Sequence, residues 1–226
     1  VNNGASGDTM DLTINGTTLT QFALTNDATA SANIAAAILG NSTLAASLSV
    51  TDNGNGTVDI IDTTGADITI DDITLTDAAG TTLNATVQSL TAANSVIGTA
   101  STVNSGEGVV MTGHLSFTAA DATKSYSLFS SDGAGKITSA TSAAKGTGAA
   151  ENITFTGFET ASHNSIDAAT PNSAVTAQTL TFVTDGKSDS IAIAADATAA
   201  DIAASVNNDL DGLSATAVSG MRLAFG

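Results

Sequence analysis

The sequence predicts a mostly β fold with short helices, of the α+β class, in which two ββαββ modules flank a β-rich region. Three observations support this prediction. Many short runs alternate polar and apolar residues, Asn-Gly and Asp-Gly dipeptides separate pairs of such runs, and an Ala-rich helical stretch follows a hairpin near each end. Only 4% of the residues are aromatic, so the core must consist mainly of Val, Ile, Leu and Ala.

The first module begins with a hairpin and continues into a helix. Asn15-Gly16 is the preferred dipeptide of a type I′ turn between two β-favouring runs. Ile34 and Ile38, four residues apart, define one apolar face of a helix over 29–39, and Gly40 stands where that helix would end. A second hairpin is expected around the turn 52–56. The strands of this module are expected at residues 11–14, 17–24, 44–51 and 57–61.

The same order of elements recurs near the C-terminus. Asp185-Gly186 marks a hairpin turn, Ile202 and Val206 give the helix 199–207 its apolar face, and Thr198 with Asp201 resembles a capping box. Because such short helices do not persist alone, both apolar stripes must be buried against a sheet. The strands of this module are expected at residues 179–184, 189–194, 213–218 and 221–225, the last two as a strand pair.

Between the modules the sequence predicts strands without a clear helix. The residues around Pro171, from 159 to 176, predict a linker, and 98–108 is a second candidate boundary. We therefore expect a first module with extra strands over 1–98, a β-rich middle region over 99–170 and a second module over 171–226. The middle strands are expected at residues 67–70, 73–76, 83–90, 109–117, 125–130 and 152–158.

The charge excludes two classes of partner. Twenty-two acidic residues oppose five basic ones, a net charge of −17. A surface with so few cations cannot displace the counterions of nucleic acid, so it has little affinity for it. An anionic membrane repels such a surface. No apolar run approaches the roughly 18 residues that span a bilayer. With no Cys in the chain, disulfides and thiol chemistry are excluded as well.

The sequence predicts no catalytic, cofactor-binding or metal site. His114 and His163 lie far apart and outside any His-Glu-x-x-His spacing, so we expect no enzyme and place His114 on a strand surface. Two acidic segments are candidate calcium sites: the loop 52–59, and Asp67 with Asp71, Asp72 and Asp77. Turn formation and protection of sheet edges explain both segments without a metal.

The second module resembles the flagellin hook IN motif of bacterial flagellins, hook-associated proteins and filament cap proteins. Residues 198–207 are similar to the helix of this family, which ends in Ile-Asn, and residues 180–193 and 213–225 flank it. Residues 34–38 fit the same helix in the first module, although Leu39-Gly40-Asn41 stands where a single Asn is expected. Residues 58–70 are similar to flagellin segments that follow the motif.

The resemblance implies a secreted, structural outer domain of a flagellin, in the hypervariable region exposed on the filament. Neighbouring subunits of the filament are its expected partners, and the isolated chain is expected to be monomeric, because the terminal helices that build the flagellar core have no counterpart here. An extracellular adhesin or S-layer-like domain that binds calcium or glycan is the alternative.

Overall fold

The computed structural model places most of the chain. It describes residues 7–24, 27–76, 85–92, 95–111, 113–119, 126–130, 140–142, 151–153, 164–167 and 177–225. Within these ranges the fold is mostly β with few short helices, as predicted. No helix among them is long and apolar enough to cross a membrane.

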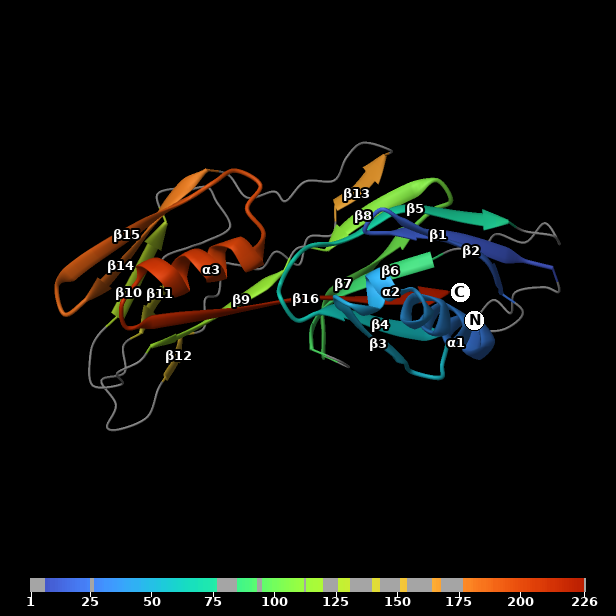
Figure 1. The fold of residues 1–226 in the computed structure, drawn as a ribbon, viewed down its shortest axis with the longest axis horizontal. Helices are drawn as coiled ribbons and strands as arrows, with labels where there is room; N and C mark the ends of the chain where they lie inside the picture. Colours follow the sequence, from blue (N-terminus) through green and yellow to red (C-terminus); the bar gives the residue numbers. More distant parts are fainter. Residues whose placement is uncertain are drawn as a thin grey trace.

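The described residues form two lobes along the longest axis of the molecule (Figure 1). Lobe 1 contains a five-stranded antiparallel sheet in the order β13-β8-β5-β1-β2. Its strands are β13 (Asn164–Asp167), β8 (Glu107–Met111), β5 (Ile68–Thr76), β1 (Thr9–Ile14) and β2 (Thr17–Ala23). Met10, Leu12 and Ile14 alternate with partly exposed residues and are fully buried, so one face of this sheet lies on the core.

A seven-stranded sheet extends through both lobes. Its central strand, β16 (Leu213–Phe225), pairs with β9 through its first half and with β4 and β6 through its second. The remaining pairs are β9 with β12, β4 with β3 and β6 with β7. The strands are β3 (Leu48–Asp52), β4 (Thr57–Asp62), β6 (Ala85–Ala92), β7 (Ser95–Val103), β9 (His114–Ala119) and β12 (Glu151–Ile153).

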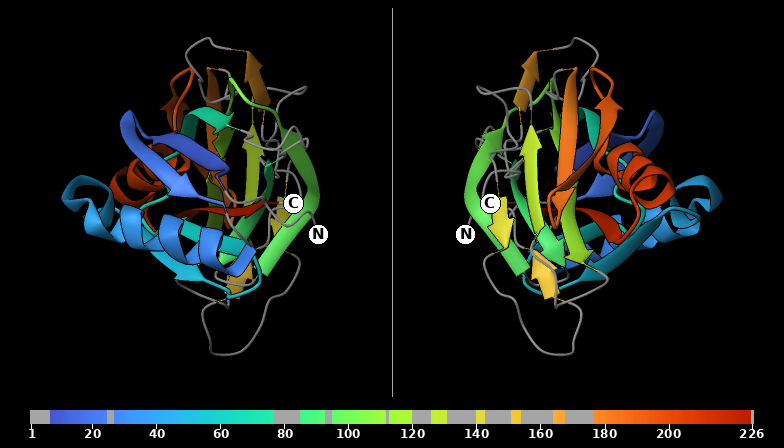
Figure 2. Two further views of the ribbon diagram at one scale, coloured as in Figure 1. Left: turned by 90° about the vertical axis from the view of Figure 1, so that its right-hand side faces the viewer. Right: turned by 90° about the vertical axis from the view of Figure 1, so that its left-hand side faces the viewer.

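Lobe 2 adds a four-stranded sheet in the order β11-β10-β14-β15. These strands are β11 (Ala140–Ser142), β10 (Tyr126–Ser130), β14 (Gln178–Thr184) and β15 (Lys187–Ile193). Each lobe carries its helices on its flank, as the end-on views show (Figure 2). The helices are α1 (Asp27–Gly40) and α2 (Ser42–Ala45) in lobe 1 and α3 (Ala199–Asp209) in lobe 2.

The hairpins predicted at Asn15-Gly16, at 52–56 and at Asp185-Gly186 are confirmed, and so are both helix stripes. Asn15-Gly16 and Asp185-Gly186 all have positive φ, which is the backbone of a type I′ turn. Ile34, Ile38, Ile202 and Val206 are fully buried. The capping box of Thr198 and Asp201 is present at the start of α3. These features depend on neighbours in sequence, and the local pattern was enough to find them.

Three strand predictions were wrong in detail. Residues 213–218 and 221–225 are not a strand pair but one strand, β16, so the second unit is ββαβ. The pairing of β16 with β4 runs without interruption through Ser219 and Gly220, so the strand continues past its Ser-Gly dipeptide. A Cβ on Gly220 would lie 2.7 Å from the Leu90 carbonyl oxygen, so the glycine makes room for this neighbour. The predicted strand 109–117 is β8 and β9, interrupted at 112–113, and the predicted pair at 67–76 is the single strand β5.

The start of the predicted strand 44–51 and part of the predicted linker were also wrong. Residues 42–45 form the one-turn helix α2, because the Asn41 side chain accepts hydrogen bonds from the N–H groups of Thr43 and Leu44. Within the predicted linker 159–176, β13 adds a strand to the five-stranded sheet. His163, Pro171, Asp77 and most of the predicted strand 152–158 lie outside the described residues.

The buried side chains do not follow the predicted division into 1–98, 99–170 and 171–226. One apolar cluster contains α1, β1, β5 and β8 together with Met221 and Leu223 of β16. The other contains α3, β14 and β15 together with Leu115 of β9 and Leu213 of β16. Each of the last two predicted domains therefore contributes to both lobes, because β16 and the β8–β9 segment pass from one lobe to the other.

Candidate functional site

The joint between the lobes brings together two closely packed glycines, a perturbed carboxyl group and the N-terminus of a helix. Strand β16 crosses it without a break, and every second side chain of this strand faces inward. Leu213 and Ala215 lie in the lobe 2 core, and Met221 and Leu223 lie in the lobe 1 core. Between them the inward positions are Ala217 and Ser219, which are small enough to let other backbone segments approach.

Two glycines make that close approach. A Cβ on Gly65, which follows β4, would lie 2.1 Å from the Ala217 Cβ. A Cβ on Gly113, which links β8 to β9, would lie 2.6 Å from the Ser219 Oγ and 2.8 Å from the Ala199 Cβ. Real Cβ atoms do not come this close to their neighbours, so the two lobes are packed backbone to backbone at this point.

Helix α3 presents its N-terminus to the joint. The Ala200 N–H donates to the Gly65 carbonyl oxygen at 3.1 Å, which ties the helix to lobe 1. The Asp201 carboxylate accepts from the Thr198 N–H at 2.9 Å, and the Asp201 N–H donates to the Thr198 hydroxyl at 3.2 Å. The first turn of the helix is therefore capped, and it carries an acidic side chain that the helix dipole favours.

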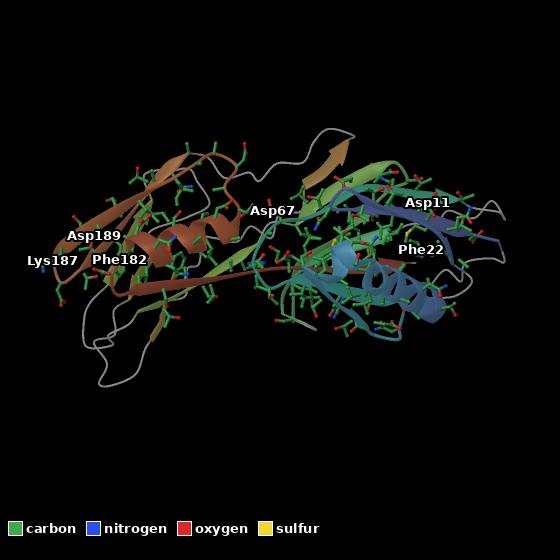
Figure 3. All side chains as sticks on the ribbon, viewed as in Figure 1. Asp11, Phe22, Asp67, Phe182, Lys187 and Asp189 are labelled. Carbon is green, nitrogen blue, oxygen red and sulfur yellow. The ribbon has the colours of Figure 1, made fainter. Side chains whose placement is uncertain are left out.

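Asp67 has the most perturbed carboxyl group at the joint, and its position between the lobes is visible in Figure 3. Burial raises its pKa from 3.8 to about 6; the Gly113 N–H opposes this by hydrogen bonding to the carboxylate, and the Asp201 charge adds to it. The folded protein therefore binds this proton more tightly than the unfolded chain. Stability falls as pH rises through the window between about 4 and about 6, and stays lower above it.

We expect the substitution Gly65→Ala to lower the free energy of unfolding by about 2–4 kcal/mol, because it combines a left-handed backbone with a collision. The φ angle of Gly65 is +80°, and the atoms it would meet belong to Ala217, which has no flexible side chain to move away. Gly54 is the matched control: its φ angle is +70°, but nothing lies within 4 Å of an added Cβ. Gly54→Ala should cost about 1 kcal/mol from backbone strain alone.

Chemical denaturation of both variants measures the difference. Equal losses for Gly65→Ala and Gly54→Ala would mean that the joint is not packed as described.

An ion pair with a buried carboxylate lies next to the joint, within lobe 1. Arg222, the single arginine of the sequence, donates from Nε to Asp59 Oδ1 at 2.6 Å and from a terminal nitrogen to Oδ2 at 2.8 Å. Both residues occupy directly paired positions of β16 and β4. The Asp59 side chain is fully buried, and its hydrogen bond raises the pKa of Arg222.

In the two acidic segments that are candidate calcium sites, the carboxylates bind separate partners and do not converge on one point. In the loop 52–59, Asp52 accepts from the Gly54 N–H at 2.9 Å, while Asp59 is held by Arg222. In the second segment, Asp71 accepts from the Gly16 N–H at 2.7 Å and Asp72 from the Thr74 hydroxyl at 2.9 Å. Among the residues that the structure describes, no group of three or more acidic or His side chains is placed to hold a metal ion.

His114 lies at the beginning of β9 and is half-buried, with its Nε2 3.3 Å from the Ser89 Oγ. It is therefore less exposed than the predicted strand-surface position. At the far end of lobe 2, an open pocket of about 320 Å³ is lined by Thr184, Asp185, Lys187, Asp189 and Asp211. Figure 3 shows Lys187 and Asp189 at this end of the molecule.

No protein-family model, no curated protein and no solved structure matches the chain. The geometry of the chain itself is therefore the basis for a functional assignment.

Asn207, in the last turn of α3, has a role that the sequence did not reveal. Its side-chain amide donates to the Ala215 carbonyl oxygen at 2.8 Å and accepts from the Ala215 N–H at 2.8 Å. This pair of bonds fastens the helix to β16. In the first unit, Asn41 instead caps α2, so the two units differ at the position where their sequences also diverge.

Proposed function

We propose that the chain is a structural, solvent-exposed outer domain of a bacterial flagellin, secreted and displayed on the filament surface, with no catalytic role. The observation that carries this proposal is the unit built by β14, β15, α3 and β16. Its residues are the ones that resemble the flagellin hook IN motif, and its helix has both a capping box at the start and the Asn207 bonds at the end. The Asn of the motif thus has a structural reason to stand where it does.

The arrangement of the lobes supports a projecting domain. Strand β1 and the end of β16 both belong to lobe 1, since Met10 and Leu223 lie in the same apolar cluster. Lobe 2 extends away from them along the long axis (Figure 1). A domain joined to a longer chain near these two strands would hold lobe 2 outward, with β16 as a continuous connection.

The net charge supports a role in which many copies of the domain lie close together. At −17, neighbouring copies repel one another over a screening length of about 8 Å in physiological salt. Such repulsion favours solubility and a monomeric isolated domain. Contacts between outer domains on a filament then depend on positioning by the filament core, so neighbouring subunits are the proposed partners.

In-frame deletion of residues 7–225 from the parent flagellin should leave filaments that still form but are thinner or smoother. Electron microscopy of the deletion strain, with the restored gene as control, measures the outcome. Complete loss of filaments would contradict a surface role. Filaments of unchanged diameter with lost attachment to cells or glycans would favour the adhesin alternative.

A further inference from the structure

Four Asn-Gly dipeptides occur in the sequence, and the structure describes three of them. The three are Asn15-Gly16, Asn53-Gly54 and Asn55-Gly56, whereas Asn3-Gly4 lies outside the described residues. An Asn that precedes Gly can deamidate without an enzyme, because glycine has no Cβ to keep its backbone nitrogen away from the preceding side chain. The folded structure decides which of the three pairs can react.

The reaction has three requirements that a structure can test. The Gly nitrogen loses its proton and attacks the Asn side-chain carbon, so that an N–Cγ bond forms. The Cγ–Nδ2 bond then breaks, and Nδ2 takes up a proton and leaves as ammonia. Water opens the resulting succinimide ring to Asp or isoaspartate. The Gly N–H must therefore be able to lose its proton, the Asn side chain must be free to approach it, and Nδ2 must be free to leave.

Asn15-Gly16 fails the first two requirements. The Gly16 N–H donates to Asp71 Oδ2 at 2.7 Å, and a carboxylate so close opposes the formation of a second negative charge on this nitrogen. The Asn15 side chain is held as well, because its Oδ1 accepts from the Thr69 N–H at 2.8 Å. The turn between β1 and β2 is therefore protected.

Asn53-Gly54 is protected in the same way and at its leaving group. The Gly54 N–H donates to Asp52 Oδ1 at 2.9 Å. The Asn53 Nδ2 donates to the Thr57 hydroxyl at 2.9 Å and to Asp59 Oδ1 at 3.0 Å. Loss of Nδ2 as ammonia would break both bonds and place a second carboxylate against Asp59.

Asn55-Gly56 lacks these restraints. In the described part of the chain the Gly56 N–H donates to no carboxylate, and Nδ2 of the exposed Asn55 has no partner. The Thr57 hydroxyl donates to Asn55 Oδ1 at 2.7 Å. A donor at this place stabilises the negative charge that forms on Oδ1 when the carbonyl carbon is attacked.

One feature of this pair opposes the reaction: Gly56 is buried, and burial disfavours a charged nitrogen. However, Gly56 lies at the end of a hairpin, next to the exposed Asn55. The bond from the Asn53 N–H to the Thr57 carbonyl oxygen, at 3.0 Å, closes the turn. Turns of this kind open locally more readily than the strands they join, and opening brings water to Gly56.

We propose that Asn55 is a site of spontaneous deamidation, and that the carboxylates of Asp52 and Asp71 protect the other two described Asn-Gly pairs. Each ageing copy of the protein then gains a negative charge in the turn between β3 and β4. The product carboxylate still accepts from Thr57, so the turn keeps this bond. The inference rests on the turns alone and does not depend on the filament role.

Incubation of the full chain in mildly alkaline buffer, followed by peptide mapping with mass spectrometry, measures deamidation at each Asn. The same chain unfolded in guanidinium chloride supplies the rate of each site without structure. In the folded chain Asn15 and Asn53 should react at least about tenfold more slowly than in the unfolded chain, the effect of one pKa unit from a neighbouring charge. Asn55 should keep most of its unfolded rate.

Asp71→Asn tests the protection of Asn15, because the amide oxygen can still accept from the Gly16 N–H but carries no charge. Deamidation of Asn15 should become about tenfold faster. Asp72→Asn is the matched control, since the Asp72 carboxylate accepts from the Thr74 hydroxyl, and it should leave Asn15 unchanged. Both rates are taken from the same peptide maps.

The role of Thr57 is tested by a pair of substitutions. Thr57→Val removes the hydroxyl that donates to Asn55 and should slow deamidation of Asn55. Thr57→Ser retains a hydroxyl and should restore the rate.

Three results would overturn the proposal. If Asn55 is slowed by folding as strongly as Asn15 and Asn53, the burial of Gly56 governs its reactivity. If Asn15 is no faster in Asp71→Asn, the carboxylate does not protect it. If Thr57→Val leaves the rate at Asn55 unchanged, the hydroxyl does not assist the attack. The first comparison uses the unaltered chain and so does not depend on the folding of any variant.

Discussion

Replacing Arg222 with methionine is expected to lower the free energy of unfolding by about 3–5 kcal/mol, because it leaves a buried carboxylate without its cation. The Asp59 side chain is fully buried, whereas Arg222 keeps 22% of its side chain exposed. The guanidinium binds both carboxylate oxygens at 2.6 and 2.8 Å. Asn53 also donates to Asp59 Oδ1, at 3.0 Å, but an amide supplies no positive charge.

A double variant separates the ion pair from its surroundings. Arg222→Met together with Asp59→Leu removes both charges and should recover most of the loss, since apolar replacements of a buried pair are often neutral. Lys187→Met removes an exposed cation at a hairpin turn and should change stability by no more than about 0.5 kcal/mol. Urea denaturation at neutral pH measures all three. A loss below about 1 kcal/mol for Arg222→Met would show that water reaches Asp59.

The local elements of the fold could be predicted from the sequence because their causes are local. The Asn15-Gly16 and Asp185-Gly186 dipeptides take up positive φ in both hairpins, and the four-residue spacing of Ile34 and Ile38 follows the helix period. The partners of each strand could not be predicted in the same way. The sequence around Ser219-Gly220 does not indicate that Leu90, about 130 residues earlier in the chain, packs against this part of the strand.

The same reason explains why the joint could not be predicted from the sequence. Gly65 and Gly113 are indistinguishable in sequence from glycines that form turns, and their role depends on what packs against them in space. In the sequence Asp67 is one of four acids in its segment, and nothing there distinguishes it from Asp71, which accepts from the Gly16 N–H, or from Asp72, which accepts from the Thr74 hydroxyl. Two features of the sequence do point to contacts of this region: Arg222 is the single arginine in a strongly acidic chain, and Asn207 ends the stretch that resembles the helix of the flagellin hook IN motif.

Ile202→Ala is expected to lower the free energy of unfolding by about 2–5 kcal/mol, the range for a large side chain removed from a tightly packed core. Ile202 is fully buried between α3 and its sheet, and alanine itself favours helix, so lost packing must account for the loss. Ala204→Ser, on the exposed face of the same helix, should change stability by no more than about 0.5 kcal/mol. A loss that small at Ile202 would mean that the apolar face of α3 is not packed as the structure describes.

Ile34→Ala makes the equivalent change in lobe 1, where Ile34 is also fully buried. Strand β16 supplies Leu213 to one core and Leu223 to the other. When one lobe unfolds, its half of β16 is released, and the sheet of the other lobe loses the support of that half. Both variants should therefore shift one common transition in calorimetry, by similar amounts. If Ile202→Ala instead produces a separate early transition while Ile34→Ala does not, lobe 2 unfolds alone. The joint is then a flexible tether and not a shared structural element.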